Sequence, residues 1–134
     1  MKTYRVSLIL LALVIILSAC GGGASSDSGP AAVIESYETA WNAKDLNAVM
    51  ALYAEDAVEK NGLGTFTGQS QIRSMLDQAM KTFALECGNY EVNGNAVSYD
   101  CVLKSYGGSS DITETYDAVI ENGKIKSNIL TGTK

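Results

Sequence analysis

The sequence predicts an α+β fold in which about three helices pack on one face of a curved, mainly antiparallel sheet. Two observations support this prediction. Apolar residues recur at helical spacing as far as Phe83, and beyond it they alternate with a period of two. The second half is also divided by turn dipeptides and glycine-rich segments that are typical of β-hairpins. Because the helices come first and the strands follow in a row, we expect a meander of strands covered by helices.

Three amphipathic segments precede the change of period. The first begins at Pro30, which suits the first turn of a helix, and its apolar face carries Val33, Ile34, Tyr37, Ala40 and Trp41. Asp45 is placed to cap a second helix, whose buried side would carry Leu46, Val49, Met50 and Tyr53. Tyr53 and Asp56 are expected to pack and cap at the end of that helix. The third helix is the clearest, with one apolar stripe formed by Ile72, Met75, Leu76, Ala79, Met80 and Phe83.

The strands are predicted from alternation and punctuation. Residues 58–67 contain the turn 61–64 between two short strands. Four longer strands are expected at 84–92, 96–106, 112–120 and 124–130. Hairpin signals separate these four strands: Asn93-Gly94, the segment 107–110 (Gly-Gly-Ser-Ser) and Asn122-Gly123.

The N-terminus carries the features of an export signal. Lys2 and Arg5 precede an unbroken apolar run, 6–17, which is too short for an ordinary membrane span. The following Leu17-Ser-Ala-Cys20 resembles the lipobox of bacterial lipoproteins, in which cleavage precedes the cysteine and acyl chains such as palmitate are attached there. We therefore expect a signal peptide at 1–19, and a lipidated Cys20 with a flexible linker at 20–30. The folded domain would then span 31–134. A plain secretory signal is the alternative.

The charge composition of the mature chain argues against some classes of binding partner. Lys2 and Arg5 belong to the signal, so the rest of the chain carries all 15 acidic residues against a smaller number of basic ones. Such a surface repels nucleic acid and anionic lipid, so membrane attachment would come from the acyl chains, on the extracytoplasmic face. The chain contains no histidine. This excludes Ser-His and Cys-His nucleophiles and most zinc sites, and neither a metal nor an organic cofactor is implied.

Cys87 and Cys101 are an even pair if Cys20 carries lipid. A hairpin turning on the three residues 93–95 would place the two cysteines directly opposite each other, within disulfide range. A two-residue Asn93-Gly94 turn would shift the register by one residue and separate them. We expect the disulfide, with two buried free thiols as the alternative.

The segment 37–58 (YETAWNAKDLNAVMALYAEDAV) resembles the opening of the nuclear transport factor 2-like superfamily, which includes the SnoaL-like polyketide cyclases and the ketosteroid isomerases. The segment 68–73 (GQSQIR) resembles the start of that superfamily's third helix, and 122–125 (NGKI) its last hairpin. The likeness covers 31 to about 130. It implies a cone-shaped fold with an internal pocket, and the fold serves enzymes, binding proteins and assembly modules alike.

The resemblance to ketosteroid isomerases also implies roles for individual residues. Their first enolate hydrogen-bond donor corresponds to Tyr37, and the nearest match to their second, a protonated aspartate, is Asp117. Their proton-shuttling base corresponds to Asn61, whose amide cannot act as a base. Glu59, two residues earlier, is the nearby carboxylate that could replace it.

Each of these residues has a purely structural alternative. Tyr37, Trp41 and Tyr53 could simply pack in the core. Asp117 could face solvent, since Tyr116 and Ala118 could point inward instead. Glu59 could be a surface charge.

The sequence thus predicts an exported lipoprotein whose pocket binds a small apolar ligand or a partner. The expected pocket residues are Tyr37, Trp41, Tyr53, Asn61 and Asp117. One alternative is a proton-transfer enzyme using Tyr37, Asp117 and Glu59 on a carbonyl substrate. Another is an assembly module that forms homodimers. Two or more carboxylates converging on one pocket would favour the enzyme, and an apolar pocket would favour binding.

Overall fold

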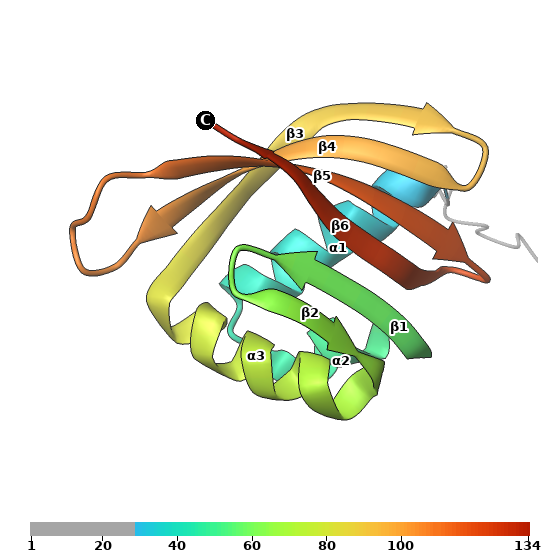
Figure 1. The fold of residues 1–134 in the computed structure, drawn as a ribbon, viewed down its shortest axis with the longest axis horizontal. Helices are drawn as coiled ribbons and strands as arrows, with labels where there is room; N and C mark the ends of the chain where they lie inside the picture. Colours follow the sequence, from blue (N-terminus) through green and yellow to red (C-terminus); the bar gives the residue numbers. More distant parts are fainter. Residues whose placement is uncertain (1–28) are drawn as a thin grey trace, which may run out of the picture.

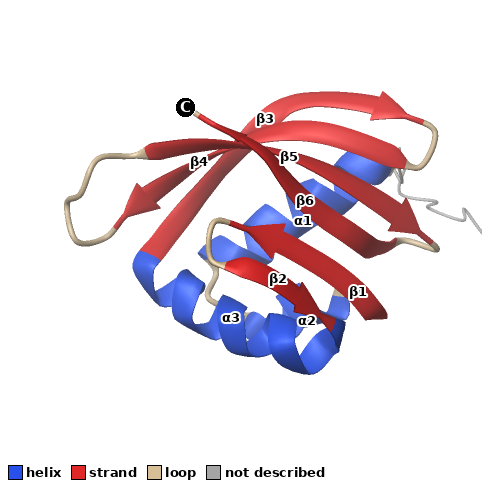
Figure 2. Ribbon diagram, in the orientation of Figure 1, coloured by secondary structure: helices blue, strands red, loops and turns tan. Residues whose placement is uncertain are grey.

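The computed structural model describes residues 29–134. The expected signal peptide, Cys20 and nearly all of the expected linker lie outside these residues. Three helices, α1 (Pro30–Asn42), α2 (Leu46–Ala51) and α3 (Gly68–Thr82), lie on one side of a strongly curved sheet (Figures 1 and 2). None of the described helices is long and apolar enough to cross a membrane.

The sheet has six strands: β1 (Tyr53–Asn61), β2 (Gly64–Thr67), β3 (Phe83–Asn93), β4 (Ala96–Ser105), β5 (Ile112–Glu121) and β6 (Lys124–Thr133). Their order is β2-β1-β6-β5-β4-β3. The pair β1–β6 is parallel, and every other pair is antiparallel. The fold is therefore the α+β cone that the sequence predicts.

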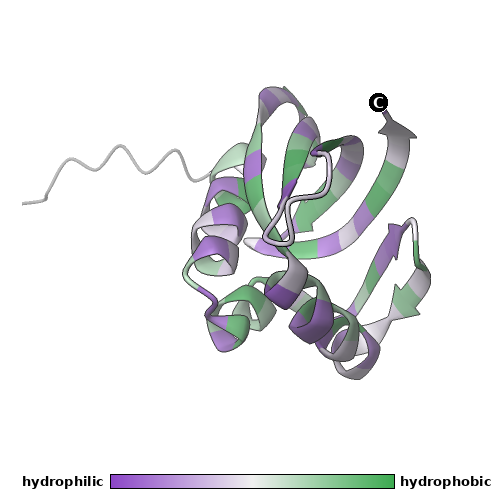
Figure 3. Ribbon diagram, turned by 90° about the vertical axis from the view of Figure 1, so that its left-hand side faces the viewer, coloured by the Kyte–Doolittle hydropathy of each residue, from purple (hydrophilic) through white to green (hydrophobic). Residues whose placement is uncertain are grey.

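The hydrophobic core lies between the helices and the concave face of the sheet. Hydrophilic and hydrophobic residues alternate along the long strands, as Figure 3 shows, so one face of each strand turns toward the helices. The fully buried side chains come from every layer: Ile34, Val49, Ile72, Leu76, Val97, Tyr99 and Ile125. This arrangement leaves α1 and α3 facing the sheet across its concave side, where a pocket can form.

The predicted second helix begins as expected and ends earlier. Asp45 caps α2, accepting a hydrogen bond of 2.9 Å from the backbone N–H of Ala48. The prediction that Tyr53 and Asp56 end this helix is wrong, because both belong to β1. The segment is rich in helix-forming residues, but pairing with β6 and β2 outweighs that preference. Asp56 is exposed and forms an ion pair with Lys126 of β6, which lowers the pKa of its carboxyl group.

A disulfide joins Cys87 of β3 to Cys101 of β4, as predicted, at directly paired positions whose Cα atoms are 4.0 Å apart. The route to this register differs from the expected one. The turn has two residues, Gly94 and Asn95, rather than the three at 93–95. A β-bulge after Gly88 then shifts the register back by one residue, with Asn89 in the left-handed conformation (φ 56°).

Candidate functional site

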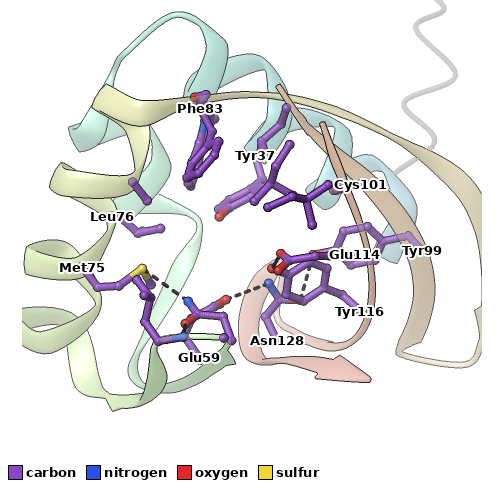
Figure 4. A pocket seen from close by; sticks show the side chains of 18 residues that line it. Tyr37, Glu59, Met75, Leu76, Phe83, Tyr99, Cys101, Glu114, Tyr116 and Asn128 are labelled. Atoms are coloured by element: carbon purple, nitrogen blue, oxygen red, sulfur yellow. Dashed lines mark hydrogen bonds between the residues drawn. The ribbon is translucent and has the colours of Figure 1, made fainter. Parts of the chain in front are cut away.

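A cavity of about 310 Å³ lies between the concave face of the sheet and helices α1 and α3 (Figure 4). Its wall is mostly apolar. Leu63, in the β1–β2 turn, and Ile112, at the start of β5, are exposed apolar residues of this wall. The lining residues are Tyr37, Trp41, Glu59, Asn61, Gly62, Leu63, Met75, Leu76, Ala79, Phe83, Leu85, Tyr99, Cys101, Leu103, Ile112, Glu114, Tyr116 and Asn128.

Glu59 of β1 is the buried acid of this pocket, with only 3 % of its surface exposed. Its carboxyl group accepts a hydrogen bond of 2.9 Å from the Tyr53 hydroxyl. A second hydrogen bond, of 3.3 Å, comes from the side-chain amide of Asn128 on β6. Figure 4 shows Glu59 and Asn128 facing each other beside the cavity. Pairing of β1 with β6 sets this contact, because Glu59 is the register partner of Asn128.

Burial raises the pKa of Glu59 from 4.5 to about 8, and the nearby Glu114 carboxyl group adds to the effect. The hydrogen bonds from Tyr53 and Asn128 oppose the shift without cancelling it. Glu59 is therefore mostly protonated at neutral pH. A protonated carboxyl group can donate a hydrogen bond to a ligand, and it can release a proton when its surroundings change.

Glu114 of β5 is a second carboxyl group in the pocket wall, where it accepts a hydrogen bond from the Tyr116 hydroxyl. The buried Tyr99 hydroxyl donates to the side-chain oxygen of Asn128 at 2.8 Å. The rings of Tyr99 and Tyr116 stack with their centroids 5.6 Å apart. The Tyr99–Asn128 hydrogen bond thus links β4 to β6, and the ring stack links β4 to β5, at the sheet side of the cavity.

The structure brings most of the sequence-predicted residues together. Tyr37, Trp41 and Asn61 line the cavity, as does Glu59, which is not a surface charge. Tyr53 is buried just behind the wall and reaches the site through Glu59. Burial also raises the pKa of the Tyr37 hydroxyl well above its usual value, so it stays neutral.

Asp117 does not line the cavity. It is exposed on the convex face of β5, where its carboxylate accepts a hydrogen bond of 2.6 Å from the Ser98 hydroxyl. The inward positions of β5 are Tyr116 and Ala118, one on each side. Asp117 therefore cannot serve as the second donor, because strand alternation points its side chain away from the pocket.

Sequence reasoning missed Glu114, Tyr99 and Asn128, and it gave Tyr116 only as an alternative inward residue of its strand. The alternation of residues in β5 could have predicted Glu114 and Tyr116. With Ala118 they lie at every second position, on one face of the strand. The prediction that Asp117 faces the pocket chose the wrong face of β5. Glu114 lies on the opposite face and was therefore not considered. Asn128 had no such signal, because its place depends on the parallel pairing of β6 with β1.

Among residues 29–134, no group of three or more Cys, Asp or Glu side chains is placed to hold a metal ion. The side chains of the site carry carboxyl, amide and phenol groups. The site offers hydrogen bonds, a proton that can be transferred, and an apolar surface.

Comparison with known proteins supplies the family. A sequence model of the SnoaL-like domain matches residues 33–127. The chain belongs to the SnoaL-like family. Its cone fold is that of the wider nuclear transport factor 2-like superfamily. A comparison with curated proteins gave no match.

Solved structures show the same SnoaL-like fold at low sequence identity. A proposed polyketide cyclase from Sinorhizobium meliloti is 22% identical, with a TM-score of 0.68 over 74% of this chain and 93% of the other. A protein of unknown function from Cytophaga hutchinsonii is 16% identical, with a TM-score of 0.67 over 76% and 88%. A ketosteroid isomerase-like protein from Catenulispora acidiphila, solved with trimethylamine, is 17% identical, with a TM-score of 0.63 over 75% and 84%. These likenesses concern the fold, and a SnoaL-like domain fits either a ligand-binding or an enzymatic role.

Proposed function

We propose that this SnoaL-like domain binds a small, largely apolar molecule in its pocket, with Glu59 recognising a polar group on that molecule. One observation carries the proposal: an apolar cavity of about 310 Å³ contains a buried carboxyl group at its wall. Binding pockets for small molecules combine apolar walls with a few convergent polar groups in this way.

Trp41 provides the readout for a binding experiment. It is the one tryptophan of the chain, it lines the cavity, and its indole N–H donates to the Phe83 carbonyl at 2.9 Å. Acetophenone and 4-ethylphenol are suitable neutral probes. Both should change the Trp41 fluorescence saturably, and calorimetric titration should give the same dissociation constants.

The matched control fills the cavity. Ala79 lines the pocket from α3 and is half-buried, so Ala79→Phe places a ring in the ligand space. This variant should fold and lose the response. Equal binding by wild type and Ala79→Phe would contradict the pocket as the binding site. Mass spectrometry of organic extracts from the purified protein would then identify any small molecule that the wild type retains and Ala79→Phe does not.

A proton-transfer enzyme is the second candidate, and a specific observation favours it. Two carboxyl groups, Glu59 and Glu114, line one pocket, and Glu59 has a pKa of about 8. A general base works best with a pKa near the operating pH. The ionised form of Glu59 would take the proton, and Tyr37 would donate a hydrogen bond to the substrate oxygen. Turnover of a carbonyl substrate that is lost in Glu59→Gln would support this candidate over simple binding.

We further propose that the domain is exported and held at the extracytoplasmic face of a membrane through acyl chains on Cys20. The support is sequence alone: a positive start, a short apolar run and the Leu17-Ser-Ala-Cys20 ending. Two or more acyl chains would be needed for stable anchoring. In that setting the pocket would meet molecules of the cell envelope or its surroundings.

A further inference from the structure

The charge and the aromatic content of the pocket indicate which class of small molecule it takes. We infer that the pocket selects a cation: an apolar molecule carrying an ammonium group, with Glu59 and Glu114 as its counter-charges. This inference rests on the proposed binding function and narrows it to one ligand class.

The ionisable side chains that line the pocket, apart from its tyrosines, are all acidic. Glu59 and Glu114 both line it, whereas the described lining residues include neither a lysine nor an arginine. The chain has no histidine to supply a positive charge. An anionic ligand would therefore meet like charge with no compensating base. A cation would gain an opposite charge in a site largely removed from solvent, where such an interaction is poorly screened.

Aromatic rings form a large part of the remaining wall. Five of them line the cavity: Tyr37, Trp41, Phe83, Tyr99 and Tyr116. They come from α1, β3, β4 and β5, so aromatic groups stand on both the helix side and the sheet side. Rings of this kind attract an ammonium group through their negative faces, and sites for quaternary ammonium ligands are commonly built from several such rings.

Tyr37 brings both a ring and a hydroxyl group to the pocket. It is 5 % exposed, and Figure 4 shows its side chain directed into the pocket. The hydroxyls of Tyr53, Tyr99 and Tyr116 donate to Glu59, Asn128 and Glu114 respectively. The Tyr37 hydroxyl interacts with the neighbouring Tyr53 hydroxyl, so it is not without a partner. Its ring remains part of the aromatic wall that a cation would meet.

Binding of a cation should be linked to proton release. The titratable groups that face Glu59 are Tyr37, Tyr53, Tyr99, Tyr116 and Glu114, and none of these is basic. Glu59 holds its proton at neutral pH because burial disfavours its charge. A bound ammonium group removes that penalty, so Glu59 should ionise and release up to one proton. Affinity for a permanent cation should rise toward pH 8 and weaken by up to about tenfold per pH unit below it.

Three compounds of one shape test the inference. Choline carries a permanent positive charge, 3,3-dimethylbutan-1-ol is its neutral carbon analogue, and 3,3-dimethylbutanoate is an anion of similar size. Each compound would be titrated into the full-length protein at pH 6, 7 and 8, and binding would be followed by the change in Trp41 fluorescence. Calorimetry in two buffers of different ionisation enthalpy would count the protons released.

We expect choline to bind at least about tenfold more tightly than the alcohol at pH 8, and the anion to bind weakest. Glu59→Gln, which resembles the protonated side chain, should reduce that preference and abolish both the pH dependence and the proton release. Glu114→Gln should weaken choline with little effect on the alcohol. Asp117→Asn is the matched control, because it removes the same charge from β5 on the face away from the pocket.

Two results would overturn the inference. One is an alcohol that binds as tightly as choline or more so. The other is a preference for choline that survives in both Glu59→Gln and Glu114→Gln. In either case, binding of acetophenone or 4-ethylphenol would leave the proposed binding function standing. If neither these neutral probes nor any member of the choline series binds, both the inference and the proposed function fail.

Discussion

The Tyr53 hydroxyl donates a hydrogen bond of 2.9 Å to Glu59, six residues further along the same strand. A regular strand would separate positions six apart by about 20 Å, too far for this contact. The strand is irregular here: Tyr53 pairs with Ile125 of β6, whereas Val58 pairs with Ser127. Five steps along β1 thus match two along β6, so β1 contains extra residues between these two pairs. The irregularity brings Tyr53 back to Glu59 and fixes the carboxyl group at the cavity wall.

Glu59 should make the fold less stable as pH rises. The unfolded chain loses this proton near pH 4.5, whereas the folded protein keeps it up to about pH 8. Between these values the folded state binds more protons, so the free energy of unfolding falls with increasing pH and then levels off. Glu59→Gln should remove this fall and stabilise the protein by up to about 4 kcal/mol at pH 8. Urea denaturation of both proteins at pH 5 and pH 8 measures it, with Asp117→Asn as control. Equal stability changes in all three proteins would contradict the buried neutral carboxyl group.

The Cys87–Cys101 disulfide should contribute to stability through the unfolded chain. It joins cysteines with a sequence separation of 14, which corresponds to roughly 3 kcal/mol in the chain-entropy account. The double variant Cys87→Ala with Cys101→Ala should lose about that much free energy of unfolding. Reduction of the wild type should have the same effect, and reduction should leave the variant unchanged. Two titratable thiols at positions 87 and 101 in the unreduced native protein would show that the bond is absent.

Cys20→Ser tests the proposed anchor. Without the thiol there is no sulfur to acylate, so the protein should leave the membrane fraction or accumulate uncleaved. Cell fractionation and the intact mass of the mature protein distinguish these outcomes. Ser18→Ala, which keeps a small residue before the cysteine, is the control and should remain membrane-bound. A cleaved Cys20→Ser protein that still sediments with membranes would require another means of attachment.

Substitution of Asn61 tests whether the pocket lacks a general base at this lining position. The Asn61 side-chain oxygen accepts a hydrogen bond of 2.9 Å from the Leu63 backbone, and its amide lies 3.5 Å from the Met75 sulfur. If the domain is a binding protein, the wild type should isomerise a small cyclic enone no faster than background. Asn61→Asp should accelerate the reaction, since a positioned general base supplies about 10²–10⁴-fold.

Tyr37→Phe in the Asn61→Asp background should reduce that rate, because the substrate oxygen loses a hydrogen-bond donor. Progress curves for the wild type and the two variants make the comparison. Rapid wild-type turnover that Glu59→Gln abolishes would instead favour the proton-transfer enzyme.

The sequence was sufficient for the elements whose signals are local. The apolar stripe of α3, the Asp45 cap and the Asn122-Gly123 turn each follow from neighbouring residues. The turn adopts positive φ at both positions (51° and 71°), as a two-residue hairpin of this type requires. The change from helix to strand at Phe83 could also be predicted, because the spacing of apolar residues changes there from helical to alternating.

The site was less accessible to sequence reasoning because it depends on contacts distant in the chain. Glu59 and Asn128 are in contact because β1 pairs in parallel with β6. The same pairing explains why Tyr53, expected at the end of a helix, lies in a strand. Asp117 and Tyr116 lie on opposite faces of one strand, and both alternations fitted the sequence. Burial, which sets the chemistry of Glu59, is a property of the assembled cone.

The bulge at Asn89 compensates for the short β3–β4 turn, so the two cysteines still lie opposite each other. A two-residue turn with one extra residue in β3 gives the same opposition of Cys87 and Cys101 as a three-residue turn with none. Removing Asn89 alone would place the cysteines out of register, whereas removing it and adding one residue at the turn would restore them. The hairpin can thus exchange a residue between its middle and its tip while the crosslink beside the pocket stays in place.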